Sequence, residues 1–321
     1  MILLDGAMAT QLAARGFELR APLYSARALL DAPELVAEIH LDYLRAGAQV
    51  LTSNTFNLHT PTLAEAGIAE LQGPLVARAI ELLEVVRRTA LAHARSLARF
   101  RVAGSIPPRP GPRAGDDPAL AAAQYRGLAE HLAHAGADLI LLETFTGLSE
   151  IRHALSGVAG LGLPVWLSIS AGAGVSGSGE GSRRRPDGAR LIGGEPIAEL
   201  AADLDRVDAL LINCTQIDAV PPALDALVEL TRARPALPLG LSPHFGKRRH
   251  DGAWIERIVD ADVFAAQVHA WVDRPSRAAR FELAGACCGS EPGDIAALQA
   301  RLQPSTEAQE RSWTRLAELV P

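Results

Sequence analysis

Asp138-Leu139-Ile140-Leu141-Leu142-Glu143-Thr144 is a short apolar run that ends in polar residues, and seven other runs follow the same plan. Each run is followed by a turn or a polar segment and then by an amphipathic stretch rich in Ala and Leu. The eight predicted strands are Ile2–Leu4, Gln49–Thr52, Arg101–Gly104, Asp138–Leu142, Pro164–Ile169, Ala209–Ile212, Leu237–Leu241 and Arg280–Ala284. The helices predicted between them include Pro33–Ala46, Leu75–Ala98, Pro118–Ala135, Pro196–Arg206, Pro221–Arg234 and Ala261–Val272.

The alternation of strands with helices predicts the fold class. Strands that alternate with helices form parallel βαβ units. Eight such units in 321 residues predict an α/β protein with a single (β/α)8 TIM barrel. No break in composition indicates a second domain, so we expect residues 1–321 to form one barrel domain. The stretch Thr306–Val320 predicts an extra C-terminal helix beyond the barrel.

Polar and thiol side chains gather where these strands end. Active sites of such barrels are built at the carboxyl ends of the strands. The residues that follow predicted strands are Asp5 and Gly6, Asn54 and Thr55, Glu143 and Thr144, Cys214, Cys287 and Cys288. We therefore expect all of them on one rim of the barrel.

The chain has three cysteines, Cys214 and the adjacent pair Cys287 and Cys288. An odd set of three makes a poor disulfide framework but can bind Zn²⁺ with one coordination position open. Consecutive side chains of a strand point to opposite faces, so the pair can share a metal only if the backbone bends there. Gly285 and Gly289 flank the pair and permit such a bend. Three small buried hydrophobic side chains are the alternative, which the shared rim position disfavours.

Composition excludes several classes of function. The chain has 31 basic and 37 acidic residues, a net charge of −6, which gives no electrostatic basis for nucleic-acid binding. The chain starts without a basic, apolar leader and has no apolar run near the ~18 residues of a membrane span. We therefore expect a soluble cytoplasmic protein with reduced thiols. Lys247, the only lysine, lies in a polar stretch, which disfavours Schiff-base and pyridoxal phosphate chemistry.

With these residues placed, the chain resembles the homocysteine S-methyltransferase family, zinc-dependent barrels that methylate homocysteine to methionine. The resemblance extends from Asp5-Gly6-Ala7-Met8-Ala9-Thr10 to Gly289. Its most specific motifs are Asn213-Cys214-Thr215 and Cys287-Cys288, in this order and at these strand ends. Further signposts are Pro33-Glu34-Leu35, His40, Tyr43, Ala46-Gly47-Ala48, Thr52-Ser53-Asn54-Thr55-Phe56 and Glu143-Thr144-Phe145.

The resemblance implies a cofactor and a substrate site. It implies one Zn²⁺ per chain, held by Cys214, Cys287 and Cys288. Asp5 and Glu143 would hold the amino group of the amino-acid substrate, with Asn54 and Thr144 beside them. The zinc would activate the substrate thiolate, and no separate protein base is expected, because a sulfonium donor leaves as a neutral molecule. A helix N-cap for Asp5 and a structural strand-end contact for Glu143 are the alternatives.

Three loops depart from the family pattern. They contain Ser105–Pro110 after strand 3, Ala171–Gly181 followed by Arg183–Arg185 after strand 5, and Pro243–Lys247 after strand 7. We expect these loops to set the methyl donor. His244 is a candidate donor-site residue or extra ligand, and a loop histidine with a local hydrogen bond is the favoured alternative. The five glycines of Ala171–Gly181 predict a mobile loop.

One motif points to a different ligand. Gly172–Gly177 fits the G-x-G-x-x-G fingerprint of dinucleotide-binding proteins. That fingerprint requires a helix to begin within it, whereas here Ser178–Ser182 and three arginines follow. We therefore interpret it as a loop.

Three functions agree with the sequence. The first is a zinc-dependent S-methyltransferase that moves a methyl group from S-methylmethionine or S-adenosylmethionine to homocysteine. The second is a barrel methyltransferase that uses betaine or a cobalamin-protein partner, and the third is a non-catalytic zinc- or thiol-binding homologue. The partners expected for the first are small molecules, a thiol amino acid and a methyl donor. The sequence leaves the donor, the physiological thiol and a homo-oligomeric state open.

Overall fold

The computed structural model describes residues 1–93, 97–111, 117–172, 189–244, 246–247, 256–257, 259–274 and 280–321. Its centre is an eight-stranded parallel sheet in the order β1-β12-β9-β8-β5-β4-β3-β2. A parallel bridge between Leu4 and Val50 joins the first strand to the last, so the sheet closes into a barrel. The strands are β1 (Ile2–Leu3), β2 (Val50–Thr52), β3 (Arg101–Ile106), β4 (Leu139–Phe145), β5 (Val165–Ile169), β8 (Ala209–Gln216), β9 (Leu239–His244) and β12 (Phe281–Ala284).

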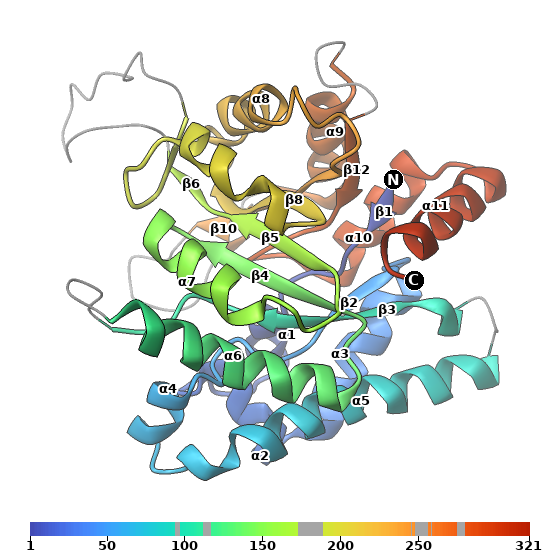
Figure 1. The fold of residues 1–321 in the computed structure, drawn as a ribbon. Coiled ribbons are helices and arrows are strands. Elements are labelled where there is room, and N and C mark those ends of the chain that lie inside the picture. Colours follow the sequence, from blue (N-terminus) through green and yellow to red (C-terminus); the bar gives the residue numbers. More distant parts are fainter. Residues whose placement is uncertain are drawn as a thin grey trace.

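Helices surround this sheet (Figure 1) and confirm the predicted α/β TIM barrel. The longer ones are α3 (Pro33–Arg45), α5 (Gln72–His93), α6 (Pro118–Ala135), α7 (Leu148–Val158), α8 (Val220–Leu230), α9 (Ala261–Val272), α10 (Pro292–Leu302) and α11 (Thr306–Leu319). The predicted helix Pro196–Arg206 is a 3-10 helix, η4 (Ile197–Arg206). Shorter elements are α1 (Met8–Ala14), η1 (Tyr24–Arg27), α2 (Ala28–Asp31), α4 (Thr60–Glu65), η2 (Ala69–Leu71) and η3 (Leu97–Arg99). Two small hairpins pair β6 (Ala171–Gly172) with β7 (Arg190–Leu191), and β10 (Gly246–Lys247) with β11 (Glu256–Arg257).

Local chemistry explains why α6 has the bounds that the sequence predicted. The Asp117 side chain accepts a hydrogen bond from the backbone N–H of Ala119, which caps the start of the helix. Pro118 occupies the first turn, where its missing N–H costs nothing. Gly136 then adopts a left-handed conformation, with φ at 101°, and ends the helix.

Four strands run further than predicted, and β3 is one of them, since it ends at Ile106 rather than at Gly104. The strands β4, β8 and β9 extend to Phe145, Gln216 and His244. The polar residues expected to follow these strands therefore lie within their carboxyl-terminal ends. The pairing register shifts between Leu142 and Phe145 and between Asn213 and Gln216, as β-bulges do. Such bulges re-aim side chains at the rim of a barrel, and here they lie beside Glu143, Thr144 and Cys214.

The hydrophobic core has two parts. The larger part lies between the sheet and its helices, and a smaller cluster fills the barrel interior with side chains such as Ile2, Val50, Trp166 and Leu211. Leu316 and Val320, from α11 and the residue after it, belong to the interior cluster. The C-terminal helix therefore packs against the barrel where β1 begins, as Figure 1 shows.

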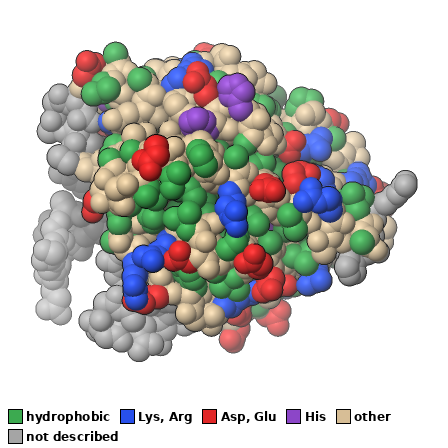
Figure 2. All heavy atoms as spheres, turned by 90° about the horizontal axis from the view of Figure 1, so that it is seen from below, with side chains coloured by type: hydrophobic (Ala, Val, Ile, Leu, Met, Phe, Trp, Pro, Cys, Tyr) green, Lys and Arg blue, Asp and Glu red, His purple; other side chains and the backbone are tan. Residues whose placement is uncertain are grey.

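Among the described helices, none is long and apolar enough to cross a membrane. The face on which α2, α4 and α5 lie carries acidic and basic side chains interspersed with hydrophobic ones (Figure 2). It shows no large patch of a single charge, in agreement with the net charge of −6.

Candidate active site

A cavity of about 420 Å³ opens at the carboxyl ends of the barrel strands. Seven of the eight predicted site residues line it: Asp5, Asn54, Glu143, Thr144, Cys214, Cys287 and Cys288. The eighth, His244, lies at the end of β9 and is not among the lining residues. The structure therefore brings together residues that are up to 283 positions apart along the chain.

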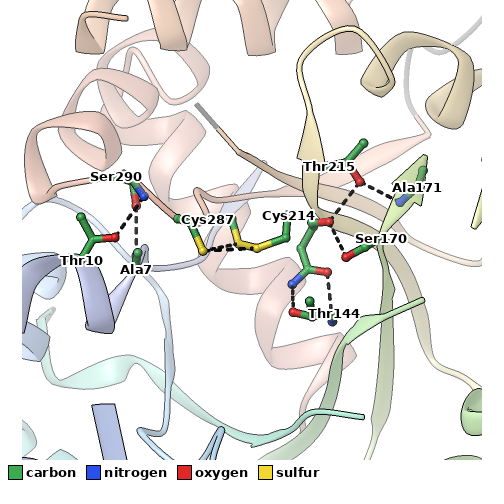
Figure 3. The surroundings of a disulfide bond; sticks show 12 residues. Ala7, Thr10, Thr144, Ser170, Ala171, Cys214, Thr215, Cys287 and Ser290 are labelled. Carbon is green, nitrogen blue, oxygen red and sulfur yellow. Dashed lines mark hydrogen bonds between the residues drawn. A yellow bond between two sulfur atoms is a disulfide. The ribbon is translucent and has the colours of Figure 1, made fainter. Parts of the chain in front are cut away.

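The three cysteine sulfurs form a compact cluster on the cavity wall. All lie within 4.8 Å of one another, with Cys214 and Cys288 Sγ atoms 3.5 Å apart and those of Cys287 and Cys288 4.0 Å apart. Cys214 and Cys287 point toward each other from β8 and from the segment after β12 (Figure 3). This is the sole cluster of three metal-binding side chains among the described residues.

The expectation of three reduced thiols is wrong for this structure. Cys214 and Cys287 form a disulfide, and Cys288 alone is free. Their Cα atoms lie 5.5 Å apart, within the range that a disulfide spans. The arrangement that lets three sulfurs share a metal also brings the Cys214 and Cys287 thiols close enough to form a disulfide. The number of cysteines in the sequence did not indicate this pairing. Reduction is required before all three sulfurs can act as thiolate ligands.

The cluster fits a zinc ion once that bond is reduced. Tetrahedral Zn²⁺ with sulfur at about 2.3 Å separates its ligand sulfurs by about 3.8 Å. The two contacts of Cys288, at 3.5 and 4.0 Å, already bracket this separation. Burial, and secondly the charge of Glu143, raise the pKa of Cys288 to about 11, so this half-buried thiol is suited to a cation that stabilises the thiolate.

Two backbone features aim the sulfurs at one point. Cys214 has φ at 44°, a left-handed conformation that is rare for a residue with a side chain and typical of functional sites. Gly289, just after the cysteine pair, has φ at 86° and turns the chain there. Gly285 has a different role from the expected bend. A Cβ atom at this position would lie 2.8 Å from Cβ of Leu4, so only glycine permits this close packing.

Asp5 is buried and already oriented. Its carboxylate accepts hydrogen bonds from the backbone N–H of Thr52 at 2.7 Å and from the Thr52 hydroxyl at 2.8 Å. It does not cap α1, whose N-cap is Ala7. Burial raises the pKa of Asp5 to about 7, the Thr52 hydrogen bonds oppose this shift, and the nearby charge of Glu143 adds to it.

Glu143 is the second carboxyl group of the cavity. The hydroxyl of Ser105, on the neighbouring strand β3, donates a hydrogen bond to its Oε1 atom. Burial raises the pKa of Glu143, and the Ser105 hydrogen bond partly offsets that effect. Asp5, which is buried, and Glu143, which is half-buried, line one cavity, and two carboxyl groups there favour a cationic ligand that would satisfy both charges.

Asn54 and Thr144 line the cavity but are also tied to the protein. The Asn54 amide donates a hydrogen bond of 2.8 Å to the carbonyl of Ser25, which holds the η1 segment against the rim. Thr144 has φ at 64°, and both its backbone N–H and its hydroxyl bond to the side-chain amide of Asn213, at 3.1 and 2.9 Å (Figure 3). Both residues therefore shape the cavity wall.

Several cavity residues were not predicted. Thr52, Ser105 and Asn213 support predicted residues through hydrogen bonds, and nothing in their spacing along the sequence indicates these partners. Tyr24 and Phe56 line the cavity with side chains that are 41% and 36% exposed. The Thr52–Phe56 motif was the one signal that could have indicated Phe56.

Two of the predicted features lie largely outside the described residues. These are two parts of the segment after strand 5, namely most of the G-x-G-x-x-G motif and all of Arg183–Arg185. Of Pro243–Lys247 after strand 7, only Phe245 lies outside the described residues. The expected mobility of Ala171–Gly181 stays a prediction.

Comparison with known proteins identifies the family. Residues 2–302 match the family described as homocysteine S-methyltransferase. The homocysteine S-methyltransferase of Escherichia coli (strain K12) is 33% identical over 326 residues, which cover 94% of this chain and 95% of that protein. The metallated form of the homocysteine methyltransferase MmuM from Escherichia coli superposes with a TM-score of 0.74 at 31% identity, covering 94% of this chain and 96% of that one. Its oxidized form gives a TM-score of 0.73 at 32% identity, with the same coverage. This chain belongs to the homocysteine S-methyltransferase family of enzymes.

Proposed function

We propose that this protein is a zinc-dependent S-methyltransferase that moves a methyl group from a sulfonium donor to homocysteine and forms methionine. One observation carries the proposal: three cysteine sulfurs within 4.8 Å of one another share a cavity with two carboxyl groups, the buried Asp5 and the half-buried Glu143. A thiol-binding metal site and an ammonium-binding site in one cavity of about 420 Å³ match a small amino acid that has a thiol.

Asp5 and Glu143 would bind the substrate ammonium. Thr52 and Ser105 hold their carboxyl groups in place, so little conformational freedom is lost when the substrate binds. Two fixed anchors for one ammonium also fix the direction of the substrate side chain. That side chain can then extend toward the sulfur cluster on the same cavity wall.

Cys214, Cys287 and Cys288 would hold the zinc ion, with one position left for the substrate. Zinc bound there lowers the pKa of a coordinated thiol and so supplies the nucleophilic thiolate. Among the described residues, the cavity lining includes no histidine, lysine or arginine, and its two carboxyl groups are assigned to the substrate ammonium. A sulfonium donor leaves as a neutral thioether, and the chain's task is then to align the donor with the thiolate.

The cavity mouth favours a cationic methyl donor. The partly exposed rings of Tyr24 and Phe56 present π-faces, which attract cations. Tyr24 has φ at 46°, a strained conformation that the rim maintains. S-methylmethionine and S-adenosylmethionine both carry the required sulfonium charge. Betaine carries a quaternary ammonium cation, so it is the second candidate on the same observation.

One assay tests the proposal and ranks the donors. The reduced, zinc-loaded protein is incubated with homocysteine and, in separate reactions, S-methylmethionine, S-adenosylmethionine or betaine, and methionine is measured. We expect methionine from a sulfonium donor. Methionine from betaine alone would replace the proposed donor, and none from any donor would favour a thiol-binding homologue.

We further propose that residues 1–321 form one domain and that the enzyme works in the reducing cytoplasm, where its thiols stay available.

A further inference from the structure

Ser168 has a buried hydroxyl group that no hydrogen bond to the described residues satisfies. It lies on β5, it is 2% exposed, and its hydroxyl has no hydrogen-bond partner among the described residues. A buried hydroxyl that lacks a partner is costly, so such groups are rare and commonly meet a ligand or a bound water. Ser168 lines the substrate cavity, so its missing partner can be an occupant of that cavity.

Ser168 lies on the strand next to the one that carries Glu143. Leu141 on β4 pairs with Trp166 on β5, and both side chains belong to the cluster inside the barrel. Ser168 lies two residues after Trp166 on an unbroken stretch of strand, so it also projects to the interior. Glu143 lies where the pairing register shifts between Leu142 and Phe145, and the cavity that it lines gives its position. Both line the cavity, in agreement with this placement.

The surroundings on the other sides of Ser168 are apolar. Its partner on β8 is Leu211, and the cavity lining near the barrel interior also includes Leu4 and Leu141. Leucine side chains offer no hydrogen bond. On the neighbouring strand β4, Glu143 lines the same cavity, and the proposed function assigns it to the substrate ammonium.

An α-ammonium group has three N–H donors, and Asp5 and Glu143 supply acceptors for two of them. Resting on the proposed function, we propose that the Ser168 hydroxyl accepts the third N–H hydrogen bond of the homocysteine ammonium. Ser168 is then a substrate-binding residue that selects α-amino thiols. Two carboxyl groups and one hydroxyl together complete the cation's hydrogen bonding.

The test compares Ser168→Ala with the wild-type enzyme on three thiols. These are homocysteine, 4-mercaptobutyrate, which lacks the amino group, and 3-aminopropane-1-thiol, which lacks the carboxylate. We expect KM for homocysteine and for 3-aminopropane-1-thiol to rise about tenfold or more, as for a hydrogen bond to a charged group. KM for 4-mercaptobutyrate should not change. Equal effects on all three thiols, no effect on any, or a selective effect on 4-mercaptobutyrate would each overturn the assignment.

Thermal unfolding without substrate is the second readout. Ser168→Ala removes a hydroxyl that has no protein partner, so the melting temperature should stay the same or rise. Ser312→Ala is the matched control, since Ser312 is also a buried serine but bonds to Gln49 at 3.0 Å and to the carbonyl of Gln309 at 2.7 Å, at the opposite end of the barrel. It should lower the melting temperature and leave every KM unchanged. A drop for Ser168→Ala as large as the control's would show that a structural water, rather than substrate, uses the hydroxyl.

The two proposals can fail separately. If the wild-type, zinc-loaded enzyme neither methylates nor binds homocysteine, the proposed function fails. If the wild type acts on homocysteine and Ser168→Ala matches it on all thiols, the function stands and the role of Ser168 fails.

Discussion

Asp5 and Glu143 place two carboxyl groups against one cavity, and each is held by a hydroxyl-bearing neighbour. Burial raises the pKa of both groups, so the empty site resists holding two negative charges. A bound ammonium removes this penalty, because it stabilises the ionised forms. Substrate charge and carboxyl ionisation are therefore coupled in this site.

Glu143→Gln tests the ammonium contact. The amide keeps the shape of the side chain but loses the charge, so KM for homocysteine should rise by about 10- to 100-fold, or roughly 1.5–3 kcal/mol. Zinc content should not change, and 4-mercaptobutyrate should be affected little. Steady-state kinetics with both thiols provide the comparison. Equal losses on the two thiols would assign Glu143 to structure instead.

The pH dependence of substrate binding tests Asp5. Its pKa of about 7 in the free enzyme means that the carboxyl group is protonated at lower pH and ionised at higher pH. The ionised form attracts the ammonium, so kcat/KM for homocysteine should fall as the pH decreases through 7, by up to about tenfold per pH unit. Asp5→Asn should have a low kcat/KM that does not fall further as the pH decreases through 7. If kcat/KM of Asp5→Asn still fell below pH 7, the titrating group would have to be another one.

At the scale of elements, the segment between β3 and α6 is held by a buried ion pair. The Arg109 guanidinium contacts the Glu150 carboxylate of α7 at 2.7 Å, and the side chains are 9% and 1% exposed. Tyr125 of α6 also donates to Glu150, and the Arg109 backbone N–H donates to the Tyr125 hydroxyl at 3.0 Å. One carboxylate thus links the segment to two helices, next to the strand that carries Ser105.

Breaking that ion pair should destabilise the protein. Arg109→Met leaves the Glu150 carboxylate buried without its cation, which costs about 3–5 kcal/mol of unfolding free energy. Arg311→Ala is a control at an exposed pair with Glu307, and it should cost less than about 1 kcal/mol. Urea unfolding measures both. If the Arg109 variant were as stable as the control, the pair would not hold the segment.

The ion pair also has a defined pH window. Burial alone would raise the pKa of Glu150, but the hydrogen bonds from Arg109 and Tyr125 and the charge of Arg109 outweigh burial and hold the pKa at about 2. A carboxyl group with a lowered folded-state pKa stabilises the protein above its ordinary pKa of 4.5 and loses this effect as the pH falls toward 2. The stability advantage of wild type over Arg109→Met should shrink in the same window.

The sequence predicted the eight strands because each is a short apolar run between helix-like segments, as in buried parallel strands. It predicted the ends of β4, β8 and β9 less well, because polar residues continue these strands through bulges. The cavity residues were predicted from the rule that sites lie at strand ends. The residues that hold these side chains in place were not predicted. The contact between Ser105 and Glu143 and the left-handed backbone of Cys214 depend on neighbouring strands.

At the scale of the whole molecule, the barrel has a functional end and a structural end. The cavity lies at the carboxyl ends of the strands, whereas α11 packs at the amino ends, where Leu316 and Val320 join the interior cluster. Gln303, just before α11, donates hydrogen bonds to the carbonyl of Met1 at 2.6 Å and to Gln49 at 2.7 Å. The C-terminal helix therefore closes the barrel and leaves the chemistry to the other end.

Leu316→Ala tests this division. The side chain is 1% exposed, and its truncation should cost about 2–4 kcal/mol of unfolding free energy through lost burial and a cavity. KM for homocysteine should not change, because the cavity lies at the far end. Leu120→Ala, at a leucine that is 61% exposed on α6, should affect neither quantity. Denaturant unfolding and kinetics on the same samples measure both quantities. A raised KM for Leu316→Ala without any loss of stability would contradict the separation of a functional end from a structural end.

The central claim is that one zinc ion, held by Cys214, Cys287 and Cys288, makes this cavity a thiol methyltransferase site. The most direct measurement is a zinc titration of the reduced, metal-free protein in which bound zinc and methionine formation are followed together. Both should rise in parallel and saturate at about one zinc per chain, and Cys288→Ser should weaken zinc binding and abolish methionine formation with the fold retained. Full methionine formation by the metal-free protein, or by Cys288→Ser without zinc, would contradict the account.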